Sequence, residues 1–403
     1  MDFDSLIAFV REHRNEDPIK LLLRKNRFPG VDVEFAVQQI EGMRQAPAKW
    51  PTLASYGRVL YPPRLNREQS SSEATADHKA EILRSLYGNS KITAIADLTG
   101  GMGIDTMAFA KLASRVDYVE RDETLCRLMR HNAAELGLTR IDVHCADSME
   151  WLAASDRHYD IIFIDPARRD SHGRKVAAFE ECVPNIMEHR ELLLSRCDTL
   201  MVKASPMMDI DKGIEQLGQV GEVYVVAVEG ECKEVLFLCE KGFGETVIHC
   251  RNIVGDKVEE RLGEFTRRQE SMAQATYCGT VGAYIFEPDA SLMKGAPFKL
   301  ISERFGLRKL SRNTHLYTGD TLVDWPGRIF RVVSEVSPSR KSIAAHLPGG
   351  KAHVVVRNYP ATAVEVQRQT GLSEGGDFFV VATTVGVKKT AFICSEEKII
   401  HNF

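Results

Sequence analysis

The 403-residue chain lacks several features that mark membrane, secreted and metal-binding proteins. No apolar run reaches the roughly 18 residues that a membrane-spanning helix needs. The first residues, Met1 to Asp4, lack the basic and then apolar pattern of a signal peptide. The nine cysteines are scattered without a Cys-x-x-Cys pair, which argues against a disulfide framework and against a zinc site. We therefore expect a reduced, cytoplasmic protein that needs no metal.

The sequence also lacks a strong charge of one sign. The formal net charge is −4, so any binding of nucleic acid has to be local. Residues 326–403 hold ten Lys and Arg against six Asp and Glu, a net charge of +4, while residues 1–70 sum to +2. The C-terminal segment is the only clearly basic part, and neither an internal repeat nor a low-complexity segment is visible.

Apolar spacing predicts how the chain is organised. Helical spacing occurs at 5–13, 17–25 and 33–43, before Pro47, Pro51, Pro62 and Pro63 interrupt it. We interpret residues 1–70 as a helical cap on a catalytic domain, in preference to a separate binding module. A further helix at 73–86, with Ser70 to Ser72 as candidate caps, leads into residues 71–244.

Residues 71–244 alternate strands and helices. Five strands separated by helices are predicted, and a pair of strands around Glu229-Gly230-Glu231 follows them: 94–97, 116–120, 141–145, 161–165, 199–203, 223–228 and 234–239. This pattern predicts a doubly wound α/β domain whose last two strands form a hairpin. A dehydrogenase sheet would end in another crossover helix instead.

Beyond residue 245 the pattern changes. We expect a strand at 246–253, a charged helix at 259–269 and a small β-α-β unit formed by 281–286, 292–305 and 313–317. The final segment predicts strands at 329–337, 343–347, 352–357, 378–383 and 390–395, with a helix at 362–370.

A glycine-rich turn follows the first predicted strand, in the sequence Asp97-Leu-Thr-Gly-Gly-Met-Gly-Ile-Asp105. Glycines allow a tight turn from strand to helix and let a ligand approach the backbone. About 20 residues downstream the second strand ends at Glu120, where doubly wound folds bind a ribose. The third strand is followed by Asp147 and Ser148. The set indicates a nucleoside-containing ligand, although Asp147 alone could equally cap the next helix.

This loop resembles motif I of class I S-adenosylmethionine-dependent methyltransferases, usually written Asp-x-Gly-x-Gly-x-Gly. Gly101 and Gly103 match the motif, and Thr99 stands where the first glycine normally lies. The terminal hairpin is also typical of that family. The resemblance implies that Glu120 binds the ribose hydroxyls, that Asp147 and Ser148 lie at the adenine, and that the methionine part contacts the remaining loop and corner residues: Asp97, Thr99, Gly100, Gly101, Gly103, Asp105 and Asp165. A NAD-dependent enzyme is disfavoured by Asp147, by Asp105 and by the hairpin.

The fourth strand leads into the reaction corner of this family, here Asp165-Pro166-Ala167-Arg168-Arg169. Enzymes that methylate exocyclic amines usually carry a second proline and an aromatic residue, whose ring stacks on a flipped base. Ala167 and Arg168 replace them, so a base amine is disfavoured. Methylation of uracil carbon 5 needs a cysteine after the fifth strand, where this chain has Lys203-Ala-Ser-Pro.

The corner is more similar to that of rRNA ribose 2′-O-methyltransferases, which use a Lys-Asp-Lys-Glu set. The residues at matching places are Lys79, Asp165, Lys203 and Glu234. The resemblance implies that Lys203 acts as general base towards a ribose hydroxyl, while Lys79 positions the acceptor. Alternatively, Lys79 is a solvated helix residue, Lys203 binds a phosphate and Glu234 is an exposed hairpin residue.

The stretch after Asp165 is rich in basic residues. Together with Pro166, they form the predicted substrate contacts: Arg168, Arg169, Arg174 and Lys175. Such a loop could clamp RNA phosphates, or it could be a solvated charged loop.

Taken whole, the chain resembles a bacterial family of methyltransferases with four regions. They are a helical N-terminus (1–70), a class I domain (71–244), a small ferredoxin-like α+β unit (245–324) and a THUMP-like domain (325–403). THUMP domains elsewhere bind RNA, so the resemblance implies an S-adenosylmethionine-dependent RNA methyltransferase acting on rRNA or tRNA. Its target would be a ribose 2′-oxygen or a ring atom of a base. A non-catalytic RNA-binding or assembly protein that retains a cofactor fold is the alternative.

Overall fold

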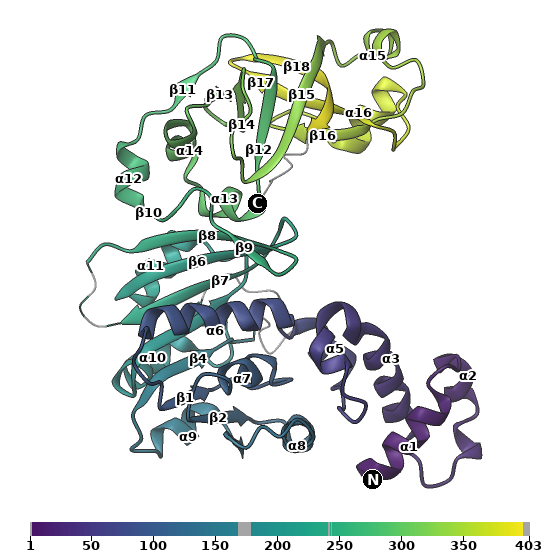
Figure 1. Cartoon of the computed structure of the whole chain (residues 1–403), viewed down its shortest axis with the longest axis vertical. Helices are drawn as coiled ribbons and strands as arrows, with labels where there is room; N and C mark the ends of the chain where they lie inside the picture. Colours follow the sequence, from purple (N-terminus) through teal and green to yellow (C-terminus); the bar gives the residue numbers. More distant parts are fainter. Residues whose placement is uncertain (1, 168–178, 241, 243, 398–403) are drawn as a thin grey trace. The chain divides into compact units, whose positions relative to one another are not determined.

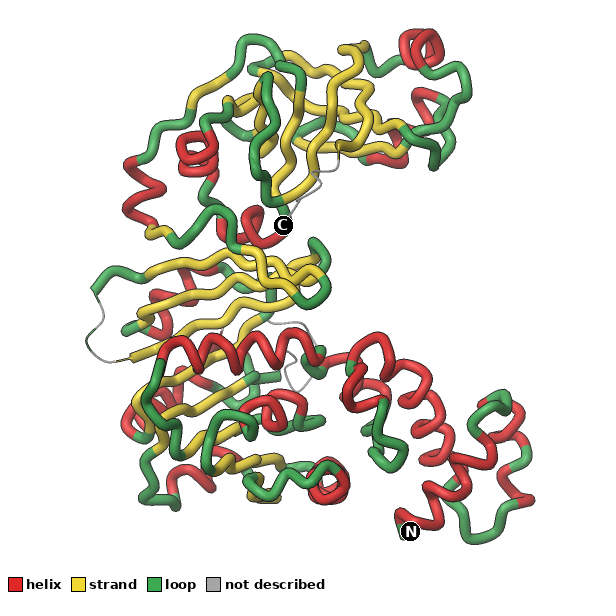
Figure 2. The backbone as a smooth tube through the Cα atoms, viewed as in Figure 1, coloured by secondary structure: helices red, strands yellow, loops and turns green. Residues whose placement is uncertain are grey.

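The computed structural model describes residues 2–167, 179–240, 242 and 244–397. The chain, whose helices and strands are drawn in Figures 1 and 2, divides into two compact units. The first comprises Met1–Val220 with Phe237–Phe243, and the second comprises Gly221–Leu236 with Gly244–Phe403. None of the helices in the described part of the chain has both the length and the apolar character that crossing a bilayer requires.

The first unit begins with a group of helices, as predicted. They are α1 (Phe3–His13), α2 (Pro18–Leu23), η1 (Lys25–Arg27), α3 (Val33–Lys49), α4 (Pro51–Ala54) and α5 (Arg64–Gln69). Asp2, Asp17 and Asp32 cap α1, α2 and α3, because each carboxylate accepts a backbone N–H of the first turn. The predicted break at Pro47 is wrong, since Pro47 lies inside α3, which continues to Lys49.

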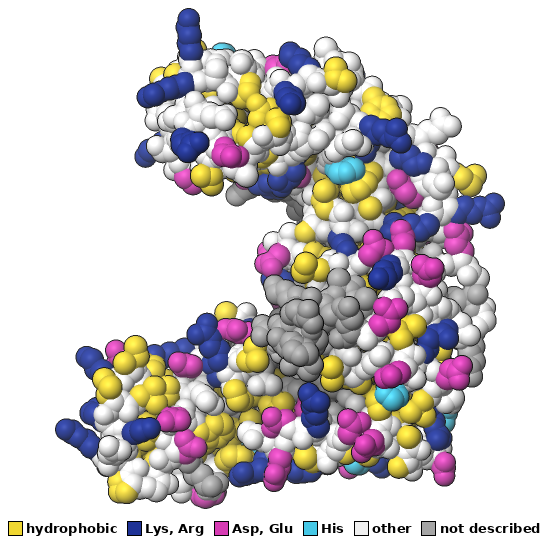
Figure 3. Space-filling model, turned by 180° about the vertical axis from the view of Figure 1, so that it is seen from behind, with side chains coloured by type: hydrophobic (Ala, Val, Ile, Leu, Met, Phe, Trp, Pro, Cys, Tyr) yellow, Lys and Arg dark blue, Asp and Glu magenta, His cyan; other side chains and the backbone are white. Residues whose placement is uncertain are grey.

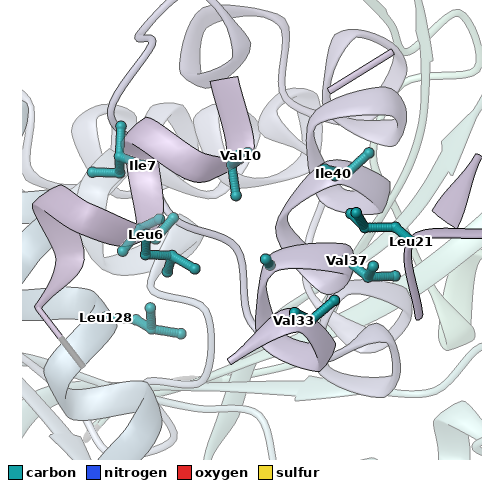
Figure 4. Packing of buried hydrophobic residues seen from close by; sticks show 10 residues of the cluster. Leu6, Ile7, Val10, Leu21, Val33, Val37, Ile40 and Leu128 are labelled. Atoms are coloured by element: carbon teal, nitrogen blue, oxygen red, sulfur yellow. The ribbon is translucent and has the colours of Figure 1, made fainter. Parts of the chain in front are cut away.

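The N-terminal helices pack on the α/β domain that follows them through one apolar cluster (Figure 4). Leu6, Ile7 and Val10 of α1 and Val37 of α3 are buried together with Leu128 of α8 (Glu123–Glu135). On the face drawn in Figure 3, hydrophobic side chains also lie among Lys and Arg at the surface of these helices.

Two buried amides reinforce this packing. Asn132 of α8 accepts the Leu60 N–H at 2.9 Å and donates to the Leu60 carbonyl at 2.8 Å. Gln39 of α3 pairs in the same way with the backbone of Tyr61, at 2.7 and 2.8 Å. The extended segment between α4 and α5 is thus fixed by side chains from both sides.

The rest of the first unit is the predicted α/β domain. Its elements are α6 (Glu73–Tyr87), β1 (Ala94–Asp97), α7 (Ile104–Phe109), β2 (Arg115–Glu120), α8, β3 (Ile141–Cys145), α9 (Ser148–Ala153), β4 (Tyr159–Ile164), η2 (Phe179–Glu181), α10 (Ile186–Ser195), β5 (Cys197–Ala204) and α11 (Ile210–Leu217). The strand order β5-β4-β1-β2-β3 is parallel throughout. Ser72 caps α6 by accepting the Thr75 N–H, as the serine run predicted.

The predicted terminal hairpin is also present. It consists of β6 (Val220–Val228) and β7 (Glu231–Glu240), and β7 lies between β6 and β5 in the strand order. Glu229 and Gly230 have φ angles of 49° and 76°, and positive φ at both positions is what a two-residue hairpin turn requires. The doubly wound prediction with a hairpin end is confirmed.

In the second unit, β8 (Val247–Val254) runs parallel to β6, and β10 (Phe265–Thr266) runs antiparallel to β8. The predicted helix at 259–269 is wrong. Residues 257–259 form β9 (Lys257–Glu259), Gly263 adopts a φ of 76°, and only α12 (Arg267–Met272) is helical. Phe265 is 1% exposed beside β8, so burial of this side chain outweighs the polar helical composition around it.

A second sheet of eight strands follows in this unit, in the order β11-β13-β14-β12-β15-β18-β17-β16. The elements are β11 (Thr276–Tyr277), β12 (Tyr284–Pro288), α13 (Ala290–Gly295), α14 (Phe298–Phe305), β13 (Arg308–Ser311), β14 (Thr314–Gly319), β15 (Gly327–Val336), α15 (Arg340–His346), β16 (His353–Arg357), α16 (Ala363–Thr370), β17 (Phe378–Val385) and β18 (Lys388–Glu397). The predicted strand at 343–347 is wrong. Ser339 caps a helix there, and Ile343 and Leu347, four residues apart, are both buried.

Candidate active site

The glycine loop between β1 and α7 contains three glycines with different tasks. Gly101 and Gly103 adopt positive φ angles of 54° and 82°, which side chains disfavour. A Cβ on Gly100 would lie 2.3 Å from the Tyr118 ring, whereas a Cβ on Gly101 would meet nothing closer than 3.6 Å. Gly100 therefore packs against the protein, and Gly101 borders open space that a ligand can occupy.

Two side chains of β2 hold the backbone of Gly101. Glu120 Oε2 accepts the Gly101 N–H at 3.0 Å, and Tyr118 Oη donates to the Gly101 carbonyl at 2.7 Å. The second carboxylate oxygen of Glu120 accepts the Asp122 N–H at 3.0 Å. Glu120 is only partly buried, so a fixed carboxylate adjoins the open side of the loop. This arrangement fits the ribose contact that the sequence predicts.

Asp97 lies beneath the loop. It is 1% exposed, and it accepts the Thr106 hydroxyl at 2.5 Å and the Thr99 N–H at 3.1 Å. Burial raises the pKa of the Asp97 carboxyl to about 7. Asp97 thus supports the loop from within.

Lys79 and Asp105 form a buried network next to the glycine loop. Lys79 Nζ lies 3.1 Å from Asp105 Oδ1, and the Lys79 side chain is 0% exposed against 12% for Asp105. Lys79 also donates to the Thr75 carbonyl and to Ser71 Oγ, and Ser71 Oγ donates to Asp105 at 2.7 Å. The interpretation of Lys79 as a solvated helix residue is therefore wrong, and its predicted contact with the acceptor stays a prediction. The network fastens the first turn of α7 to α6.

Asp147 is the N-cap of α9, because its Oδ1 accepts the N–H groups of Met149 and Glu150 at 3.0 and 3.1 Å. Its side chain is exposed after β3, and Ser148 beside it is partly buried. Both capping hydrogen bonds use Oδ1 of Asp147, so they leave Oδ2 for a ligand. The adenine contact of Asp147 and Ser148 stays a prediction.

The reaction corner joins β1, β4 and β5. Asp165 directly follows β4, and its carboxylate forms an ion pair with Lys203 of β5; their side chains are 28% and 6% exposed. The Asp165 N–H donates to Thr99 Oγ1 of the glycine loop at 2.6 Å. Pro166 is buried. The predicted neighbours Asp165 and Lys203 are in contact, and Thr99 links them to the loop.

Ala167 of this corner pairs with Val183. Ala167 and Val183 exchange backbone hydrogen bonds of 2.8 and 3.2 Å. The predicted phosphate contacts Arg168, Arg169, Arg174 and Lys175 lie outside the described residues. Glu234 lies on β7 within the second unit and is 2% exposed, so the alternative of an exposed hairpin residue is wrong. Its role beside Lys203 stays a prediction.

Three features of the site were not predicted from the sequence. Thr99 was treated there only as a missing glycine, although its hydroxyl is an acceptor at the corner. The pairing of Lys79 with Asp105 was also missed, and the only available signal was that a lysine and an acid flank the same loop. The contact of Tyr118 with the loop was missed as well. Its place in the second strand, two residues before Glu120, was the available signal.

Comparisons with known proteins agree with this geometry. Residues 284–326 match a family model described as a ferredoxin-like domain, and residues 327–396 match a THUMP domain-like model. These two segments share one sheet, because β12 pairs with β15. A crystal structure of an inferred methyltransferase from Porphyromonas gingivalis W83 superposes with a TM-score of 0.87, at 29% identity over 98% of each chain.

Two relatives extend the comparison. An uncharacterized S-adenosylmethionine-dependent methyltransferase from Mycobacterium tuberculosis is 25% identical over 337 residues, 81% of this chain and 86% of the relative. Ribosomal RNA small subunit methyltransferase J from Chromobacterium violaceum is 29% identical over 146 residues, which cover 32% of this chain and 55% of the relative. Together with the open glycine loop and the fixed carboxylate of Glu120, these similarities identify the chain as an S-adenosylmethionine-dependent methyltransferase with a THUMP-like C-terminal domain.

Proposed function

We propose that this methyltransferase acts on structured RNA and that the acceptor nucleotide binds at Asp165 and Lys203. The observation that carries the proposal is the ion pair between these residues at the ends of β4 and β5. It is tied to the cofactor loop through Thr99. The exposed part of Asp165 gives an acceptor access to this pair.

The cofactor loop supports binding of the methyl donor. Glu120 would hold the ribose hydroxyls, and Gly101 leaves room for the ligand beside its backbone. Asp147 at the end of β3 would reach the adenine. S-adenosylmethionine supplies an electrophilic methyl group bonded to a sulfonium sulfur.

We further propose that the acceptor is a ribose 2′-hydroxyl. A hydroxyl is a weak nucleophile, so a positioned base has to take its proton as the oxygen bonds the methyl carbon. Lys203, which pairs with Asp165 as an ammonium, would first release one proton to solvent. Its neutral amine would then accept the hydroxyl proton, and Asp165 would hold the ammonium that forms again. Lys79 supports the loop through Asp105 in this scheme, and Glu234 is left out of the reacting set.

The THUMP-like domain supports the choice of RNA. It contains a groove of about 570 Å³ whose lining includes Arg328, Arg357, His353 and Phe379. Arg328 and Arg357 both pair with Glu287, and their side chains are still 42% and 45% exposed. Arginines beside aromatic rings suit phosphates and bases of RNA. The net charge of +4 on residues 326–403 points in the same direction.

The test is nucleoside mass spectrometry of rRNA and tRNA from a deletion strain. We expect one methylated nucleoside to disappear and to return on expression of the wild-type chain. Lys203→Ala should fail to restore it. Lys212→Ala, which removes an exposed lysine of α11, should restore it and serves as the matched control.

The chemistry of the missing nucleoside decides the acceptor. A ribose-methylated product resists alkaline cleavage of its phosphodiester, and we expect this behaviour. A methyl group on a base ring would overturn the ribose assignment and favour the alternative of base methylation. An unchanged set of nucleosides in the deletion strain would overturn the choice of RNA. Isothermal titration with S-adenosylmethionine, in the wild type and in Gly101→Arg, measures cofactor binding independently of the substrate.

A further inference from the structure

Thr99 occupies a position that glycine usually fills in this loop, and the structure gives the side chain a contact that glycine cannot make. Thr99 Oγ1 accepts the backbone N–H of Asp165 at 2.6 Å. The Thr99 N–H donates to Asp97 Oδ1 at 3.1 Å, which fixes the residue from below. Thr99 is partly buried, so its hydroxyl is held in place by the surrounding loop.

The contact continues the ladder between β1 and β4. The two strands pair in parallel up to Asp97 and Phe163, and the Leu98 N–H donates to the Phe163 carbonyl at 3.0 Å. Beyond this point the backbones diverge into the glycine loop and the reaction corner. The Thr99 hydroxyl extends this ladder by one hydrogen bond, which it accepts from the Asp165 N–H. A glycine at position 99 would leave that N–H without this acceptor.

The hydrogen bond to Thr99 fixes the backbone of Asp165, a residue that the proposed reaction uses. Asp165 has its backbone fixed by Thr99 and its carboxylate paired with Lys203. Side-chain direction follows backbone direction, so a shift of the Asp165 peptide moves its carboxylate and, with it, the Lys203 amine. Methyl transfer needs the acceptor and the methyl carbon within a few tenths of an ångström of the reactive geometry.

We propose that Thr99 is a positioning residue, which sets the Asp165–Lys203 pair against the methyl-donor loop through its hydroxyl. The role of that pair at the acceptor rests on the proposed function. The bond from Thr99 to Asp165 does not, because it exists within the protein alone.

Three substitutions separate the hydroxyl from the volume of the side chain. Thr99→Val keeps the branched shape and removes the acceptor, Thr99→Ser keeps the acceptor, and Thr99→Gly restores the usual motif. Thr93→Val is the matched control, because Thr93 is an exposed residue just before β1. Thermal melts establish that each variant is folded.

The first readout needs no substrate. With aspartates selectively labelled with nitrogen-15, the Asp165 amide proton should move upfield in Thr99→Val and Thr99→Gly, because a short hydrogen bond is lost. It should stay near its wild-type position in Thr99→Ser and Thr93→Val. An unmoved Asp165 amide in Thr99→Val would overturn the proposal, whatever the substrate of the enzyme proves to be.

The second readout is methyl transfer to RNA from the deletion strain. We expect kcat to fall roughly tenfold or more in Thr99→Val and Thr99→Gly, while KM for S-adenosylmethionine changes less than about threefold. Thr99→Ser should retain kcat within about threefold. Equal kcat in the wild type and Thr99→Val would refute the positioning role, and so would a loss of cofactor affinity as large as the loss of rate. If the wild type itself transfers no methyl group to RNA, the proposed function fails, and the amide shift alone decides the role of Thr99.

Discussion

The buried carboxyl of Asp97 makes the stability of the first unit depend on pH in a direction opposite to that of most acids. Asp97 is 1% exposed, and burial raises its pKa from 3.8 to about 7. Its two hydrogen bonds, from Thr106 and Thr99, oppose this rise without cancelling it. Because the native state holds the proton more tightly than the unfolded state between about pH 4 and 7, stability falls as the pH rises through that window.

The magnitude follows from the size of the shift. About three pKa units correspond to ~4 kcal/mol for ionising the buried group, compared with the same group in the unfolded chain. Between about pH 5.5 and 8, this ionisation lowers the free energy of unfolding of the wild type by ~2 kcal/mol. Asp97→Asn removes the titration and keeps both contacts, because its amide oxygen can accept from Thr99 and its nitrogen can donate to the Thr106 hydroxyl.

The assay compares the two proteins at both pH values. Guanidinium unfolding of the whole chain, followed by tryptophan fluorescence, gives each free energy, and the variant-minus-wild-type difference cancels the other titrating groups. We expect the free energy of unfolding of Asp97→Asn, relative to that of the wild type, to rise by about 2 kcal/mol when the pH is raised from about 5.5 to 8. A difference that stays constant with pH, or that falls, would refute the assignment of a raised pKa to Asp97.

Two further predictions follow from close packing in the first unit. Gly100→Ala places a methyl group 2.3 Å from the Tyr118 ring, so we expect a loss of about 1–3 kcal/mol in stability and weaker S-adenosylmethionine binding by titration. Gly279→Ala, where a Cβ meets nothing within 4 Å, is the control and should bind normally. Asn132→Ala leaves the buried N–H and carbonyl of Leu60 without their side-chain partner, and we expect unfolding to become easier by about 2–5 kcal/mol. A loss below about 1 kcal/mol would show that water replaces the amide.

The elements that could be predicted from the sequence are those whose pattern is local and strong. Strands β1 and β3 were predicted at their observed bounds, because β1 is a short apolar run that ends at an acid and β3 alternates apolar and polar residues. The turn Glu229-Gly230 marked the hairpin, since few sequences adopt positive φ at two successive residues. The glycine loop with Glu120 was predictable for the same reason, because tight turns and ligand contact restrict residue type.

The errors fall where a distant partner outweighs local composition. Residues 259–269 are charged and helical in composition, yet pairing of Phe265 with Ile248 of β8 makes part of the segment a strand. Residues 343–347 have a strand-like composition, yet the cap at Ser339 starts a helix that buries Ile343. Neither the edge of β8 nor the site that receives Ile343 is visible in the segment itself.

The two lysines of the predicted catalytic set show why sequence position does not assign a role. Lys79 and Lys203 each lie at an element next to the glycine loop, and each is buried against an acid. The acids differ. Asp105, the partner of Lys79, is 12% exposed and is also bound by Ser71, whereas Asp165, the partner of Lys203, is 28% exposed and directly follows β4. The less accessible pair of Lys79 and Asp105 supports the fold, whereas a pair whose acid is more accessible can exchange a contact with an incoming hydroxyl. The accessibility of the carboxylate, which no sequence motif encodes, is therefore the property on which the proposed acceptor site at Asp165 and Lys203 rests.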